Sequence, residues 1–193
     1  MSNQELVRTR AKLRELDADW ALLSSPENVT YVSHYEVPID FGPLAHLNYG
    51  PVLALFGVQE EATLLVANRY YADAARQQST FDEVIGFGIL EVFAPFDKQD
   101  RYANFVMGLR QALQHAGLGG GKLRLAVEER TLPLVALQVI RTELPQVELV
   151  AADDALARVR MIKTPREIGL LKAAAEVVNV AHKELMRGPN RQG

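Results

Sequence analysis

Short apolar runs alternate with amphipathic stretches along this chain, and that alternation limits the fold more than any other sequence feature. Residues 20–24, 83–88, 123–128 and 147–150 are predicted to form strands. Residues 51–56 and 62–66 flank a short polar connection and predict a β-hairpin. Because strands alternate with helices and one pair forms a hairpin, the pattern predicts an α/β fold with a mixed sheet covered by helices.

The stretches between the strands carry helical periodicity and helix end signals. Helices are predicted over residues 3–17, 28–33, 99–116 and 134–144, with a short one beginning at Asp153. Asn68 is a predicted N-cap for a helix carrying Tyr71, Ala74 and Ala75, and Gly117 is predicted to end the helix over 99–116. Residues 34–50 show no periodicity and are predicted to form a long loop.

The last helix has the best defined start in the chain. Thr164 suits an N-cap, Pro165 suits the first helical position, and Glu167 completes a capping box. Apolar residues follow at steps of three and four, and Gly188 with Pro189 should end the helix. The stripe comprises Ile168, Leu171, Ala175, Val178, Ala181 and Leu185.

Size and composition narrow the functional classes. The chain has 193 residues, a formal net charge of −3 and no cysteine. This length suits one sizeable domain, and the absence of a basic cluster argues against nucleic acid as a partner. The sequence lacks both a signal peptide pattern and an apolar run long enough to span a bilayer. We therefore expect no membrane association and a cytoplasmic location.

No motif predicts a catalytic or metal site in this chain. The four histidines, His34, His46, His115 and His182, lack metal-ligand spacing. Glycines 119–121 stand between a helix and a strand, which is the reverse of a phosphate-binding loop. Asp153 and Asp154 are interpreted as helix-capping residues rather than paired catalytic carboxylates, and Glu128 and Glu129 as strand-end residues without a partner base or nucleophile.

The loop over residues 34–50 is the segment with the strongest functional indication. It gathers polar, aromatic and titratable side chains between two apolar regions, and long loops in compact domains are often functional. Structural packing or dimer contact is the alternative role for any one of them. The candidates for substrate access are His34, Tyr35, Phe41, His46 and Tyr49.

Four motifs follow one another along the chain. They are the Ser-Pro-Glu-Asn segment at residues 25–28 with Tyr31 and Ser33, the Arg69-Tyr70 turn, the glycine loop and strand at 119–128, and the Lys-Thr-Pro-Arg-Glu-Ile helix start at 163–168. In this order they resemble the N-terminal domain of the creatinase, prolidase and aminopeptidase P superfamily, the pita-bread metallopeptidases. The resemblance implies a three-layer mixed sheet with helices on both faces, distantly like the ribonuclease H fold. It also implies a domain over 1–163, with 164–193 as a linker helix leading into a C-terminal catalytic domain absent from this chain.

By the same resemblance, the chain is the non-catalytic N-terminal domain of an Xaa-Pro dipeptidase, aminopeptidase P or creatinase relative. It would support dimerisation and substrate access. The parent's catalytic ligands, two Asp, one His and two Glu, would lie in the other domain with two divalent ions (Mn, Co or Zn), unless the parent is creatinase-like. No cofactor is expected in this chain. The substrate would be a small peptide or a guanidino or amide compound.

One position departs from the family pattern. His34 stands where the family usually has glycine, and with Phe41 and His46 it is a candidate for a wall facing the substrate. A bulky titratable side chain changes backbone freedom and local shape, which weakens the expectation of an ordinary Xaa-Pro peptide substrate.

Two other functional classes are alternatives for this chain. The first is a stand-alone binding or scaffold module descended from this domain, acting by protein contact without chemistry. The second is a ribonuclease H-like nuclease, which would need a cluster of acidic metal ligands from several elements. The sequence favours the hydrolase domain over both.

Overall fold

The computed structural model describes residues 3–38, 50–59, 61–88, 101–119 and 121–187, without the side chains of 101, 102 and 187. The chain divides into two compact units, Met1–Val159 and Arg160–Gly193. The predicted domain division at residues 163 and 164 stays a prediction. None of the described helices combines the length and the apolar character needed to cross a membrane.

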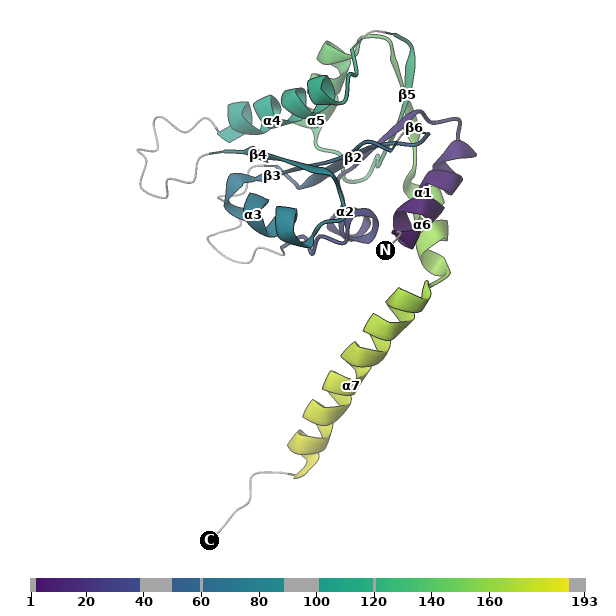
Figure 1. The fold of residues 1–193 in the computed structure, drawn as a ribbon, viewed down its shortest axis with the longest axis vertical. Coiled ribbons are helices and arrows are strands. Elements are labelled where there is room, and N and C mark those ends of the chain that lie inside the picture. The colour runs from purple at the N-terminus through teal and green to yellow at the C-terminus, as the bar shows by residue number, and fades with distance from the viewer. Residues whose placement is uncertain (1–2, 39–49, 60, 89–100, 120, 188–193) are drawn as a thin grey trace, which may run out of the picture. The chain divides into compact units, whose positions relative to one another are not determined.

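The first unit is built on a mixed sheet of six strands in the order β4-β3-β2-β1-β5-β6 (Figure 1). The strands β1 and β2 pair antiparallel, as do β2 and β3, whereas the other neighbours are parallel. The predicted hairpin is thus confirmed as β2 and β3. The strands are β1 (Trp20–Leu23), β2 (Leu53–Gly57), β3 (Thr63–Asn68), β4 (Glu83–Phe87), β5 (Leu123–Val127) and β6 (Val147–Ala151).

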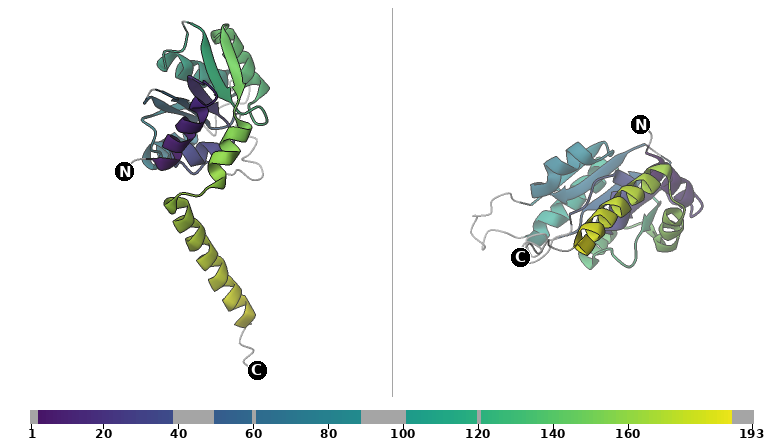
Figure 2. Two further views of the ribbon diagram at one scale, coloured as in Figure 1. Left: turned by 90° about the vertical axis from the view of Figure 1, so that its right-hand side faces the viewer. Right: turned by 90° about the horizontal axis from the view of Figure 1, so that it is seen from below.

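Helices cover both faces of this sheet, which confirms the three-layer α/β prediction (Figures 1 and 2). The helices α1 (Gln4–Arg14), α2 (Pro26–Ser33), α3 (Arg69–Gln78) and α6 (Asp153–Met161) supply buried side chains to one core cluster. The other cluster takes its helical residues from α4 (Arg101–His115) and α5 (Leu134–Glu143).

Strand side chains alternate strictly between the two clusters, as the two-residue period of a strand requires. In β1, Ala21 and Leu23 face the first cluster, and Trp20 and Leu22 face the second. The central strands place alanine on the first face at Ala21, Ala54, Ala67 and Ala126. Because both faces are buried, the strands read as continuous apolar runs rather than as alternating ones.

Local signals account for most helix ends. The Ser25 hydroxyl accepts a hydrogen bond from the Asn28 amide, so α2 begins at Pro26, two residues earlier than predicted. Asn68 caps α3 as predicted, but the buried alanines of that helix are Ala72 and Ala75, and Ala74 is exposed. Gly117 has φ +69°, the left-handed conformation that suits a glycine after α4.

Arginines on α1 hold the hairpin connection. The Arg10 guanidinium donates to the carbonyls of Gly57 and Glu61, and Arg14 donates to the carbonyl of Val58. Partial burial, with repulsion from Arg14 added, lowers the pKa of Arg10 from its ordinary value. Side chains of α1 therefore supply hydrogen-bond donors to backbone carbonyls at the connection between β2 and β3.

The second unit consists mainly of α7 (Pro165–Arg187). Its capping box is confirmed: the Glu167 amide donates to the Thr164 hydroxyl at 3.2 Å, and the Thr164 amide donates to the Glu167 carboxylate at 2.8 Å. The predicted stop at Gly188 and Pro189 lies outside the described residues. Large apolar side chains on α7 are exposed, including Leu171, Val178 and Leu185.

Replacing Gly108 in α4 by alanine should destabilise the protein, although alanine is the better helix former by about 1 kcal/mol. A Cβ at this position would stand 2.7 Å from the Cβ of Phe87, so α4 must move away from β4. We expect Gly108→Ala to lower the free energy of unfolding by about 1–3 kcal/mol in urea denaturation. Gly169→Ala in α7 is the matched control, since nothing lies within 4 Å of its added Cβ. A gain in stability from Gly108→Ala would contradict the tight packing.

Candidate functional site

Only the beginning of the predicted substrate-access segment can be placed. His34 and Tyr35 follow α2 directly, whereas Phe41, His46 and Tyr49 lie outside the described residues. Their role in substrate access therefore stays a prediction. The side chains of His34 and Tyr35 lie in different surroundings, so they make different contacts.

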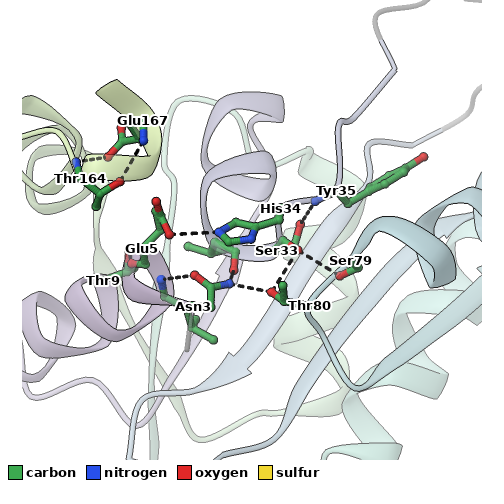
Figure 3. A network of polar contacts seen from close by, with 12 residues as sticks. Asn3, Glu5, Thr9, Ser33, His34, Tyr35, Ser79, Thr80, Thr164 and Glu167 are labelled. Carbon is green, nitrogen blue, oxygen red and sulfur yellow. Dashed lines mark hydrogen bonds and ion pairs between the residues drawn. The ribbon is translucent and has the colours of Figure 1, made fainter. Parts of the chain in front are cut away.

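His34 ends α2 in the left-handed conformation, with φ +61°. Its amide donates to the Thr30 carbonyl, and its ring Nε2 lies 3.0 Å from the carboxylate of Glu5 in α1 (Figure 3). The Glu5 side chain is 2% exposed and that of His34 16%. A left-handed position explains why glycine would suit this place, because glycine adopts it without a Cβ clash. The histidine ring, however, contacts Glu5, and a glycine at this position could not make that contact.

Side chains from two other segments complete the end of α2 (Figure 3). Asn3, the N-cap of α1, donates through its side-chain amide to the Val32 carbonyl at 2.7 Å. The Ser33 carbonyl accepts from the backbone amide of Thr80 at 2.8 Å, and also from the hydroxyls of Ser79 and Thr80. These bonds satisfy carbonyls that a helix end otherwise leaves unpaired. The start of α1, the end of α2 and the turn after α3 therefore form one junction.

Tyr35 turns into the protein. It is 1% exposed and belongs to the first core cluster, and its amide donates to the Ser33 hydroxyl at 3.1 Å. A side chain with that burial acts through packing. Among the described residues of this segment, Glu36 is exposed, and His34 is half-buried, as are Val37, Pro38 and Gly50, so all of these except Tyr35 can meet solvent.

The opposite end of α2 holds a buried carboxylate whose role the sequence analysis missed. Glu128, 2% exposed, accepts hydrogen bonds from the backbone amides of Ser24 at 2.6 Å and Ser25 at 2.9 Å. Its other oxygen accepts from the side-chain amide of Asn28 at 2.6 Å. The sequence pattern indicates a strand-end residue without a partner base or nucleophile, but it does not predict the hydrogen bonds that the Glu128 carboxylate accepts. A glutamate directly after a buried strand, together with the Ser-Pro-Glu-Asn segment, was the available signal.

Two further acidic residues, Asp153 and Glu83, form separate contacts. Asp153 lies in the first turn of α6, but its carboxylate accepts from the backbone amide of Glu129 at 2.8 Å, so it also joins two segments. His115 pairs with Glu83 at 2.7 Å on an exposed surface. Within the described ranges, no group of three or more His, Asp and Glu side chains is arranged to hold a metal ion.

Comparison with known proteins gives a family match. Residues 6–162 match the family described as the creatinase/prolidase N-terminal domain. Among curated proteins, a creatinase from Bacillus sp. (strain B-0618) is 27% identical over 184 residues. That alignment covers 93% of this chain and 39% of the creatinase, so the chain spans about two fifths of its relative's length.

Solved structures share the fold. The Xaa-Pro dipeptidase from Bacillus anthracis has a TM-score of 0.64 and 16% identity, covering 96% of this chain and 43% of that one. The N-terminal domain of the cytoplasmic peptidase PepQ from Mycobacterium tuberculosis H37Rv has a TM-score of 0.55 and 20% identity. The match covers 82% of this chain and 99% of that domain.

Two substitutions of His34 separate its backbone conformation from its ring contact. His34→Gly and His34→Ala both remove the bond to Glu5, but alanine keeps a Cβ in the left-handed conformation. We therefore expect the glycine variant to be the more stable of the two by about 1 kcal/mol in chemical denaturation. Equal stabilities would contradict the left-handed end of α2. His115→Gly and His115→Ala, in the last turn of α4, are the control pair and should show the opposite order.

Proposed function

The chain belongs to the creatinase/prolidase N-terminal domain family, and from this membership we propose that it is the non-catalytic N-terminal domain of a longer metal-dependent hydrolase. The hydrolase would resemble Xaa-Pro dipeptidase, aminopeptidase P or creatinase. The family match over residues 6–162 is the observation that carries the proposal. The relatives support it because they are hydrolases in which the corresponding domain is less than half of the chain.

The proposal assigns the chemistry to the other part of that hydrolase. The described residues of this chain do not fit a pair of divalent ions, since they include no cluster of suitable ligands. The two metal ions and their ligands would therefore belong to the C-terminal catalytic domain. This chain would support dimerisation and shape the entry of a small peptide, guanidino or amide substrate in a cytoplasmic enzyme.

His34 is the described residue best placed for a role in substrate access. It stands at the junction at the end of α2, where Glu5 holds its ring, and the segment with Phe41, His46 and Tyr49 follows it in sequence. A histidine in place of the usual glycine gives the entry a titratable group and a larger side chain. That change favours a substrate other than an ordinary Xaa-Pro peptide.

The apolar residues of α7 support the proposal that this helix leads into another domain. Its apolar residues extend around more than half of the helix circumference when placed at 100° per residue, and a single helix has no interior in which to bury them. Leu170, Val177 and Val178 are 55%, 70% and 66% exposed. The catalytic domain would cover this face. The same exposed face is the observation that favours the second candidate, a stand-alone binding module that docks another protein.

We expect the chain by itself to bind no stoichiometric pair of divalent ions and to cleave neither Xaa-Pro dipeptides nor creatine. The measurements are elemental analysis after dialysis against Mn²⁺, Co²⁺ or Zn²⁺, and chromatography of reaction products. The full-length product of the source gene, assayed in parallel, should bind the metal ions and cleave a substrate of this kind, unless it is metal-independent. Two tightly held ions per chain of 193 residues would overturn the proposal. A source gene without a downstream catalytic domain would also overturn the proposal, and the binding module would then be the remaining candidate.

Without the proposed catalytic domain, the apolar face of α7 should cause the isolated chain to self-associate, and charges on that face should weaken this association. We expect Leu171→Glu with Val178→Glu to weaken self-association of the chain at least tenfold in analytical ultracentrifugation. Each buried Leu or Val contributes about 1.5–3 kcal/mol, and 1.4 kcal/mol is tenfold in affinity. Lys172→Gln with Asn179→Glu, one position along the helix, is the matched control because it changes the net charge by the same amount, and it should behave as the unaltered chain. Equal effects of the two double substitutions would show that general charge, and not the apolar face, controls association.

A further inference from the structure

The carboxylate of Glu128 lies where two neighbouring parallel strands of the sheet end. The parallel neighbours β1 and β5 end side by side, with Leu22 opposite Val127, and Ser24 and Glu128 follow. The helix after β1, α2, packs in the first core cluster, whereas the helix after β5, α5, packs in the second. Adjacent parallel strands whose helices leave to opposite faces form the crevice in which open α/β sheets bind ligands.

The contacts of Glu128 are those of an anion bound at a helix N-terminus. Its Oε2 accepts from the consecutive amides of Ser24 and Ser25, and Ser25 is the N-cap of α2. The Asn28 side chain donates to Oε1 from inside the first turn. Helix N-termini bind phosphate and carboxylate through free backbone amides and the positive end of the helix dipole. Here the amides are those of the N-cap Ser25 and of Ser24, the residue before it. Glu128 reaches this position from the neighbouring strand, 103 residues away from Ser25.

We propose that Glu128 is an internal ligand whose carboxylate fills the anion position at the start of α2, in the crevice between β1 and β5, and thereby positions α2. Ser24, Ser25 and Asn28 all donate to it, which matches a carboxylate, a group that only accepts. The crevice that takes a free anion in related sheet architectures is here closed by the chain itself.

The position of α2 has a consequence at its other end. The helix has eight residues, a length of about 12 Å, and ends at the junction that holds His34. Asn3, Ser79 and Thr80 fix that end, and Glu128 fixes the start. Glu128 is therefore a positioning residue for the segment that begins at His34. Only this last step rests on the proposed role of that segment in substrate access.

Removing the side chain creates a site that a free ion can fill. Glu128→Ala keeps Cβ and removes a CH₂–COO⁻ group, which has the shape of acetate. We expect Glu128→Ala to melt at least 5 °C below the unaltered chain, and 0.5 M sodium acetate to raise its Tm by about 3 °C over equimolar sodium chloride. Glu129→Ala, an exposed neighbour, is the matched control. The control and the unaltered chain should respond to acetate no more than to chloride.

The ring resonances of His34 give the second measurement. They are identified by their absence in His34→Asn, and in Glu128→Ala they should shift and return when acetate is added. If Glu128→Ala does not fold, Glu128→Gln serves instead. Its side chain has one oxygen and one NH₂ group, and the NH₂ group cannot accept a hydrogen bond, so it cannot satisfy Ser24, Ser25 and Asn28 as the carboxylate does. The Tm of Glu128→Gln should therefore fall, and its His34 resonances should shift from those of the unaltered chain.

Each contrary result has a definite meaning. Equal acetate effects on Glu128→Ala and Glu129→Ala would show an adventitious ion only and would overturn the internal ligand. A lowered Tm with unchanged His34 resonances would overturn the positioning role and leave Glu128 as a stability element. If the Glu128→Gln chain matched the unaltered chain in Tm and spectrum, the need for a carboxylate would be wrong. None of these measurements uses hydrolase activity, so they stand or fail separately from the proposed function.

Discussion

The buried carboxylate of Glu128 is the interaction on which the arrangement of the other elements depends. A carboxylate that is 2% exposed has lost most of its contact with water, and that loss is offset only if its oxygens find donors. Ser24, Ser25 and Asn28 supply them within 2.9 Å. These residues come from β1 and α2, so the bond network requires β1 beside β5 and α2 above their ends.

Packing on the two faces of the sheet follows from the same arrangement. The alanines of β1, β2, β3 and β5 lie beside larger side chains such as Leu23, Phe56 and Leu65 on the face where α1, α2, α3 and α6 supply buried residues. No strand alanine belongs to the described core cluster on the other face. On the first face, the end of α2 lies near the start of α1, where Asn3 and Glu5 meet its last residues.

Several polar side chains hold the ends of secondary structure elements together. In the described part of the chain, Asn3 and Thr164 cap helices, and Glu128 and Asp153 link separate segments. His34 combines both uses, because it ends α2 and contacts Glu5. The proposed function assigns to such a domain the shaping of access to a catalytic centre in another part of a longer hydrolase.

The sequence by itself determined the local elements, because their signals lie within a few residues of one another. Continuous apolar runs predicted buried strands, Asn68 and Gly117 marked helix ends, and the capping box of Thr164 and Glu167 formed as written. The ordered motifs also identified the family. Tertiary structure alone decided that Tyr35 lies in the core and that Glu128 caps a helix 100 residues away. A periodic pattern reports which residues are apolar, but not which strand becomes the neighbour, and the partner of a buried polar group is fixed only when that neighbour is in place.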